Sequence, residues 1–114
     1  MTQAPKVWIL DTNAFDYTPA EAYGELVTLR GQNFAAGIDD DDSWNADIIH
    51  GFRKQLKDYV PVVDSLIPTG KPLRMCLISQ ILSQDHGPRH RWLAWDQSAY
   101  RYIPYVVNTA AGKN

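Results

Sequence analysis

Polar side chains and glycines that could hold a ligand follow the predicted strands of this chain. Apolar runs predict strands at residues 7–10, 26–29, 62–67 and 92–95. Ligands of open parallel sheets bind beyond the carboxyl ends of the strands, so the residues after these runs should meet at one edge. We predict a ligand-binding site there, formed by Asp11, Asn13, Arg30, Thr69, Gly70, Lys71 and Asp96.

The residue types of this set favour a nucleotide-like anion. Gly70 and Lys71 precede a predicted helix, whose first backbone amides and the nearby lysine would attract a phosphate. Asp11 and Asn13 could hydrogen-bond to a sugar or base, with Arg30 assisting. We expect binding rather than catalysis, and no cofactor.

A second hypothesis is a metal-dependent nuclease that uses Asp11, Asp64 and Asp96. Clustered carboxylates suit Mg²⁺ or Mn²⁺, which would hold a substrate phosphate. The run Ile9-Leu10-Asp11-Thr12-Asn13 resembles the first strand of PIN-domain nucleases, and the segments at Asp64 and Asp96 resemble two later motifs of that family. The PIN pattern continues from its later aspartate into a helix, whereas prolines and a glycine follow Asp64, so we place Asp64 in a strand.

A third candidate surface combines aromatic and basic residues near the C-terminal end. Interleaved aromatic and arginine side chains could stack on bases or anchor a protein partner. The net charge of −2 makes nucleic acid the less favoured partner. We predict a host-protein interface or a homo-oligomer seam formed by Trp92, Trp95, Tyr100, Arg101 and Tyr102.

The charges are distributed unevenly along the chain. Residues 1–52 hold nine acidic and two basic residues, whereas residues 53–114 hold four acidic and nine basic ones. A dipolar chain of this kind could self-associate head to tail, so a virion structural subunit is a further alternative. The run Asp39–Asp42 is interpreted as a solvated segment before a helix, where negative charge is favourable.

Short helices and turns separate the predicted strands. Thr18-Pro19-Ala20-Glu21 predicts a short helix that ends near Gly24, with Thr18 and Glu21 forming a capping box. A stripe predicts a second, amphipathic helix that Pro61 ends; its members are Trp44, Ile48, Ile49, Phe52, Leu56 and Tyr59.

A third helix is predicted from Pro72 to Gly87, mostly buried and with Cys76 in its apolar face. The last strand covers residues 100–107, where Pro104 points to a sheet edge.

The order strand–helix–strand–helix–strand–helix–strand–strand predicts an α/β fold. We expect a single domain over residues 1–114, with its core at about 6–107 and a flexible tail at 108–114. Its mainly parallel five-stranded sheet should end in an antiparallel edge hairpin. No run is long and apolar enough to span a membrane, and the single cysteine indicates a reducing cytoplasm.

Several of these motifs together resemble a family of small tailed-phage proteins. The first part reads Phe15-Asp16-Tyr17-Thr18-Pro19-Ala20-Glu21-Ala22-Tyr23-Gly24. The later parts are Gly70-Lys71-Pro72 and His86-Gly87. Phe15 stands where the family usually has histidine. The resemblance implies phage origin, hence the host cytoplasm, and an α/β sheet, without an established activity.

Overall fold

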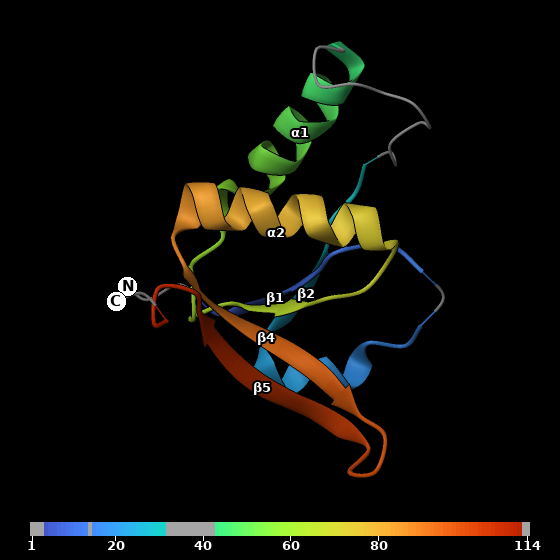
Figure 1. Ribbon diagram of the computed structural model, residues 1–114. Coiled ribbons are helices and arrows are strands. Elements are labelled where there is room, and N and C mark those ends of the chain that lie inside the picture. Colours follow the sequence, from blue (N-terminus) through green and yellow to red (C-terminus); the bar gives the residue numbers. More distant parts are fainter. Residues whose placement is uncertain (1–3, 14, 32–42, 113–114) are drawn as a thin grey trace.

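The computed structural model describes residues 4–13, 15–31 and 43–112 (Figure 1). Within them, five strands form one sheet in the spatial order β2-β1-β3-β4-β5. β1, β2, β3 and β4 are parallel, and β5 runs antiparallel to β4 at the edge, so the α/β class and its antiparallel edge are confirmed. The elements are β1 (Lys6–Ile9), the 3-10 helix η1 (Thr18–Tyr23), β2 (Glu25–Thr28), α1 (Ser43–Gln55), the 3-10 helix η2 (Leu56–Asp58), β3 (Ser65–Ile67), α2 (Pro72–His86), β4 (Arg89–Asp96) and β5 (Arg101–Asn108).

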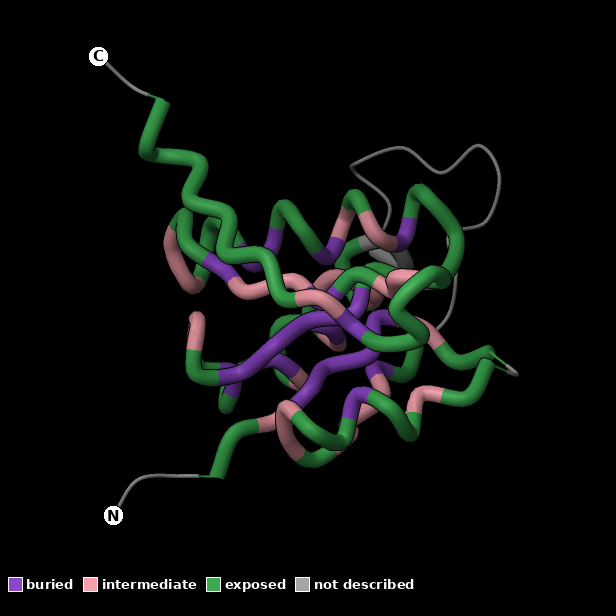
Figure 2. Tube along the Cα trace, turned by 90° about the horizontal axis from the view of Figure 1, so that it is seen from below, coloured by how far each residue is buried: buried purple, intermediate pink, exposed green. Residues whose placement is uncertain are grey.

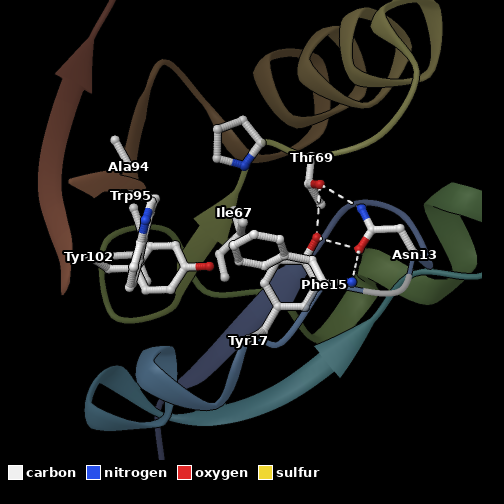
Figure 3. Close-up of a pocket in the computed structure, with 10 residues that line it drawn as sticks. Asn13, Phe15, Tyr17, Ile67, Thr69, Ala94, Trp95 and Tyr102 are labelled. Atoms are coloured by element: carbon white, nitrogen blue, oxygen red, sulfur yellow. Dashed lines mark hydrogen bonds between the residues drawn. The ribbon is translucent and has the colours of Figure 1, made fainter. Parts of the chain in front are cut away.

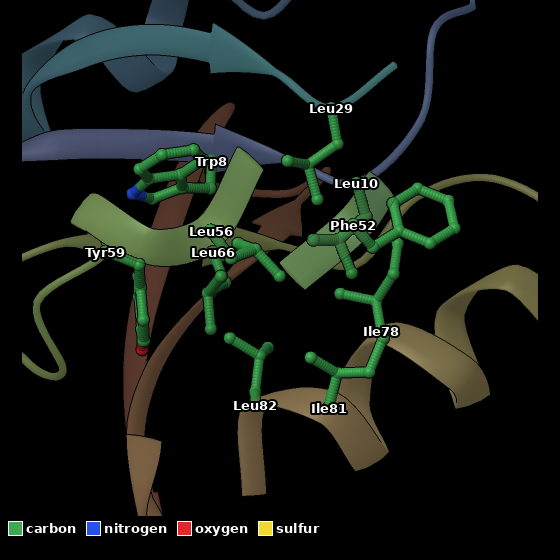
Figure 4. Close-up of a cluster of buried hydrophobic side chains, with 10 residues drawn as sticks. All are labelled: Trp8, Leu10, Leu29, Phe52, Leu56, Tyr59, Leu66, Ile78, Ile81 and Leu82. Atoms are coloured by element: carbon green, nitrogen blue, oxygen red, sulfur yellow. The ribbon is translucent and has the colours of Figure 1, made fainter. Parts of the chain in front are cut away.

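The two faces of the sheet are covered unequally. Among the described elements, both α-helices lie on one face and the short η1 lies on the other (Figure 1). Alternation along β1 sends Trp8 toward the α-helices and Val7 and Ile9 toward η1. Ten buried side chains fill the helix side (Figure 4): Trp8, Leu10, Leu29, Phe52, Leu56, Tyr59, Leu66, Ile78, Ile81 and Leu82.

A buried arginine fastens α2 to the carboxyl ends of β1 and β2. The Arg74 guanidinium donates to the carbonyls of Leu10 at 2.8 Å, Leu29 at 3.0 Å and Gly31 at 3.1 Å. It also stacks over the Phe52 ring, with 4.7 Å from Cζ to the ring centroid. Burial lowers the pKa of Arg74, against the opposing effect of a nearby carboxylate. These three carbonyls lie beyond the strand ladders, and the guanidinium supplies them with donors.

α2 buries only part of its apolar residues, which the sequence predicts to be mostly buried. Arg74, Ile78 and Leu82 are buried, whereas Leu73 and Cys76 are exposed. The prediction of a core position for Cys76 is therefore wrong: Cys76 is two residues from both Arg74 and Ile78, and a two-residue step along a helix of 3.6 residues per turn points its side chain to the opposite side.

The third strand is shorter than predicted, because residues 62–64 form a turn. Val62 has a φ of 69°, and the Asp64 amide bonds back to the Val60 carbonyl at 2.9 Å. The buried Asp64 carboxylate accepts hydrogen bonds at 3.0 Å from the Val60 and Lys6 amides and the Trp8 indole. Asp64 thus fixes the amino-terminal ends of β1 and β3.

The predicted capping box at the first helix does not form. Thr18 is the first residue of η1, and its side chain makes no cap bond to the helix. The Asp16 carboxylate instead accepts bonds from the Thr18 amide at 3.0 Å and the Thr18 hydroxyl at 2.6 Å, which lowers the pKa of Asp16. The aspartate run 39–42 lies outside the described residues.

Tyr59 and His90 form a buried pair under the helix side of the sheet. The Tyr59 hydroxyl donates to His90 Nδ1 at 2.6 Å, and Nε2 donates to the Gly87 carbonyl at 2.7 Å, which defines a neutral tautomer. Burial lowers the pKa of His90. Burial and, secondly, the charge of Asp64 raise the pKa of Tyr59, which keeps its hydroxyl protonated as the donor.

The variant Arg74→Met should have a free energy of unfolding about 3–5 kcal/mol lower than the wild type, because the three carbonyls lose their donors. The matched control is Arg53→Met, which removes the exposed Arg53–Asp85 pair at 3.0 Å and should cost about 0–1 kcal/mol. Urea unfolding measures both variants. Equal losses would contradict the anchoring role of Arg74.

Stability should also depend on pH through His90. The unfolded chain binds the proton at the ordinary histidine pKa of about 6.5, whereas the folded chain binds it only at lower pH. The free energy of unfolding should therefore fall as pH decreases below the ordinary histidine pKa of about 6.5. Urea titrations across this range should show a smaller slope in His90→Gln, and an unchanged slope would assign the effect to other groups.

Candidate functional site

A pocket of about 340 Å³ opens on the face that η1 covers, at the carboxyl ends of β1, β3 and β4 (Figure 3). It lies between the segment that precedes η1 and the residues at the ends of β3, β4 and β5. The lining is mostly apolar and aromatic, with one polar end; it comprises Asn13, Phe15, Tyr17, Ile67, Pro68, Thr69, Leu93, Ala94, Trp95 and Tyr102.

Three side chains form a closed hydrogen-bonded cluster at the polar end (Figure 3). The Tyr17 hydroxyl donates to Asn13 Oδ1 at 2.8 Å, and Asn13 Nδ2 donates to Thr69 Oγ1 at 2.9 Å. The 2.8 Å contact between the two hydroxyls must then be donated by Thr69, because Tyr17 has one hydroxyl proton. This arrangement leaves one Asn13 N–H and hydroxyl lone pairs for a ligand.

Aromatic rings form the walls of the pocket. The Trp95 ring lies edge-on to the Tyr102 ring, with 5.0 Å between the ring centroids. It is also edge-on to the Phe15 ring, with 6.4 Å between the centroids. Phe15 also lies 5.3 Å from Tyr17 and is 54% exposed, so its ring is at the mouth. Burial, with smaller contributions from Tyr17 and Asp16, raises the pKa of Tyr102, and its phenol therefore stays neutral at physiological pH.

The register of the sheet explains why distant residues meet here. Ile9 of β1 pairs with Ile67 of β3, so the segments that follow these strands leave the sheet side by side. Asn13 and Thr69 consequently come together although 56 residues separate them. The predicted site thus contains one true spatial pair at the pocket.

Asp11 and Gly70 lie beside each other and serve the fold. The Asp11 carboxylate accepts from the Thr12 amide at 2.8 Å and lies 3.5 Å from Arg74 Nε. Gly70 has a φ of 110°, and an added Cβ would collide with the Asp11 side chain. The backbone after β3 therefore passes against Asp11 only because residue 70 is glycine.

The remaining predicted ligand residues lie apart from the pocket lining. The Arg30 backbone amide donates to Gln55 Oε1 of α1 and its carbonyl accepts from Gln55 Nε2, in a separate depression on the helix side. Asp96 accepts from the Ser98 and Ala99 amides and so caps the β4–β5 turn. Lys71 is exposed at the start of α2.

The structure does not bring the three nuclease carboxylates together. Asp64 precedes β3 and is bonded at the amino-terminal end of β1, whereas Asp11 follows β1 and Asp96 ends β4. The described ranges contain no group of three histidine, cysteine or acidic residues that could hold a metal ion. Asp64 acts structurally, because backbone amides and the Trp8 indole use its oxygens.

The predicted interface residues divide between the two faces. Trp92 packs against the helix-side core, whereas Trp95 and Tyr102 belong to the η1-side cluster, and Tyr102 is 3% exposed. Tyr100 and Arg101 are exposed at the hairpin end. Together these five do not form one surface.

Phe15 and Tyr17 are two aromatic lining residues that the pattern of strand ends did not identify. They follow the segment after β1 by a few residues, in a stretch without strand or helix. The available signal was two aromatic residues spaced two apart before a proline-initiated helix. Aromatic residues in an irregular segment usually cover something, which here is the open face of the sheet.

A family model described as Phage Pam3 gp32-like protein matches residues 5–109. No curated protein and no solved structure matches the chain. The match confirms the expected relation to a family of phage proteins. No helix within the described part of the chain is long and apolar enough to cross a membrane.

The Gly70–Asp11 contact gives a prediction. Gly70→Ala should destabilise the protein more than Gly87→Ala, because both positions have positive φ but only Gly70 faces a collision. Backbone strain alone should cost about 1–3 kcal/mol in Gly87→Ala. Urea unfolding compares the two variants. An equal loss of the free energy of unfolding would mean that the Asp11 side chain moves aside at no cost, contrary to the predicted collision.

Proposed function

The chain belongs to the Phage Pam3 gp32-like protein family, and we propose that it is a phage accessory protein that acts by binding. Its ligand is a flat aromatic ring with a polar edge, such as the base of a nucleoside or nucleotide. The observation that carries the proposal is the aromatic pocket with the Asn13–Tyr17–Thr69 cluster at its end.

The size and lining of the pocket support a small planar ligand. About 340 Å³ falls in the lower part of the range for small-molecule sites, which are mostly apolar with a few placed polar groups. Phe15 and Trp95 offer faces or edges to a ring, and base–aromatic stacking contributes about 1–3 kcal/mol.

The polar cluster supports a base in particular. Its free N–H on Asn13 and its hydroxyl lone pairs form a neighbouring donor and acceptor. The hydrogen-bonding edges of nucleobases also carry donors and acceptors side by side. A purely hydrocarbon ligand would cover the remaining Asn13 N–H without giving it an acceptor, at a cost in free energy.

Lys71 supports the nucleotide form of the ligand. No lysine or arginine lines the pocket in the described part of the chain, so the base site itself is uncharged. Lys71 follows Thr69 by two residues and is exposed at the amino-terminal end of α2, where a phosphate attached to the ligand is favoured.

The test is calorimetric titration with adenosine and adenosine monophosphate. Trp95→Leu should lower the affinity for both ligands about ten-fold or more, since it removes one aromatic wall of the pocket. The matched control is Trp92→Leu, which removes the same side chain from the opposite face of β4 and should leave affinity unchanged. Circular dichroism checks that both variants fold.

Lys71→Met separates the two parts of the ligand. This variant should bind adenosine monophosphate more weakly and adenosine with unchanged affinity, because only the phosphate contacts the lysine. Failure of both ligands to bind the wild-type protein, or equal effects of the two tryptophan variants, would contradict the proposal.

The second candidate is an apolar side chain of a host protein in the same pocket. Phe15 and Tyr100, which are 54% and 74% exposed, flank Trp95 and extend the apolar surface beyond the pocket. Exposed aromatic residues around a pocket are typical anchors of protein interfaces. A host partner captured by the wild type but not by Trp95→Leu would favour this candidate over the nucleotide.

A further inference from the structure

The outer half of β5 is an exposed apolar strand edge. β5 is the last strand of the sheet, so one of its sides has no neighbour within the described residues. Tyr105, Val106 and Val107 are 55%, 47% and 46% exposed, and the chain toward the C-terminus is exposed throughout in Figure 2. Such an edge is a template for pairing with another strand.

The hydrogen bond after β5 establishes which backbone groups face outward. The Thr109 amide donates to the Pro88 carbonyl at 3.1 Å, so odd-numbered residues direct their backbone groups to the β4 side. Alternation then turns the groups of Tyr102, Pro104, Val106 and Asn108 away from β4. The Tyr102 carbonyl agrees, because it accepts from the Tyr23 hydroxyl at 3.0 Å.

Intramolecular bonds limit the open part of this edge on both sides. At one end the Tyr102 carbonyl is occupied by Tyr23. At the other end, the Ala111 amide occupies the Asn108 carbonyl at 3.1 Å, and the Asn108 side chain occupies the Ala110 amide at 3.0 Å. The outward groups between these ends are the Pro104 carbonyl, both groups of Val106 and the Asn108 amide.

These open groups are complementary to themselves. In an antiparallel pair with a two-fold axis at Val106, its amide and carbonyl bond to the Val106 carbonyl and amide of the second copy. The Asn108 amide of each copy then meets the Pro104 carbonyl of the other. Proline lacks an N–H, and the carbonyl that it would have faced is that of Asn108, which Ala111 already satisfies.

We propose that residues Pro104–Asn108 form the interface of a homodimer, in which β5 pairs antiparallel with β5 of a second copy and joins the two sheets. The hydrogen-bonding pattern selects this partner, because from Pro104 to Asn108 every outward group that lacks a counterpart across the axis is absent or already bonded.

The side chains agree with the same register. Tyr105 pairs with Trp92 and Val107 with His90 across the hairpin, so both lie on the helix face of the sheet. In the dimer Tyr105 lies opposite Val107 of the second copy, and Val106 lies opposite itself on the other face. Aromatic and β-branched residues are favourable cross-strand neighbours, and residues 102–112 carry no charge that would repel the second copy.

Val106→Pro tests the backbone pairing. Its N–H faces outward, so proline at 106 removes an intermolecular donor while leaving the β4–β5 ladder intact, as Pro104 already does. The matched control, Val106→Thr, keeps the amide and the β-branched shape. Light scattering after size exclusion should give twice 12.9 kDa for the wild type and Val106→Thr, and 12.9 kDa for Val106→Pro.

A charge pair provides a second test that does not depend on the proline variant folding. Position 106 faces itself across the axis, so Val106→Lys and Val106→Glu should each be monomeric. When mixed, they should form a heterodimer that native mass spectrometry detects.

Three results would overturn the proposal. They are a wild-type mass of 12.9 kDa at concentrations up to about 1 mM, a dimeric Val106→Pro variant, and the absence of a heterodimer in the mixture.

Discussion

Arg74 of α2 reaches through the core to three backbone carbonyls that follow β1 and β2, at Leu10, Leu29 and Gly31. These carbonyls lie where the chain leaves the sheet, and a buried carbonyl without a donor is costly. The guanidinium therefore sets the position of α2 against the strand ends. The Asp11 carboxylate balances its charge, and Gly70 allows the chain to pass beside Asp11.

The pocket depends on this anchoring. The segments after β1 and β3 carry Asn13 and Thr69, and both start from the backbone that Arg74, Asp11 and Gly70 hold in place. In the part of the chain that the structure describes, both α-helices cover one face of the sheet and η1 covers the other, where aromatic residues between β1 and η1 complete the cover.

The elements were predictable from the sequence because their signals are local. The continuous apolar run of β1 is buried on both sides, as predicted, and α2 ends at Gly87 with a positive φ. The predicted strand 62–67 is shorter in the structure, because Asp64 bonds to the Lys6 and Val60 amides and residues 62–64 form a turn.

The candidate site was predictable only in part. Strand ends indicated Asn13 and Thr69, which meet in the pocket, but also Asp11, Asp96 and Arg30, whose bonds serve turns, a buried ion pair and a helix contact. Apolar periodicity also placed Cys76 inward and missed the buried Arg74, because an arginine is buried only when its partners are supplied by other elements. Phe15 and Tyr17 lie in an irregular segment, where no periodicity exists to reveal the side that they cover.

The proposed ligand places an aromatic ring between Trp95 and the Asn13–Tyr17–Thr69 cluster. The most direct measurement is a set of intermolecular nuclear Overhauser effects on the protein saturated with adenosine. We expect contacts from the adenine protons to the rings of Trp95 and Tyr17. Contacts to Trp92 on the opposite face, or no contacts at saturation, would contradict it.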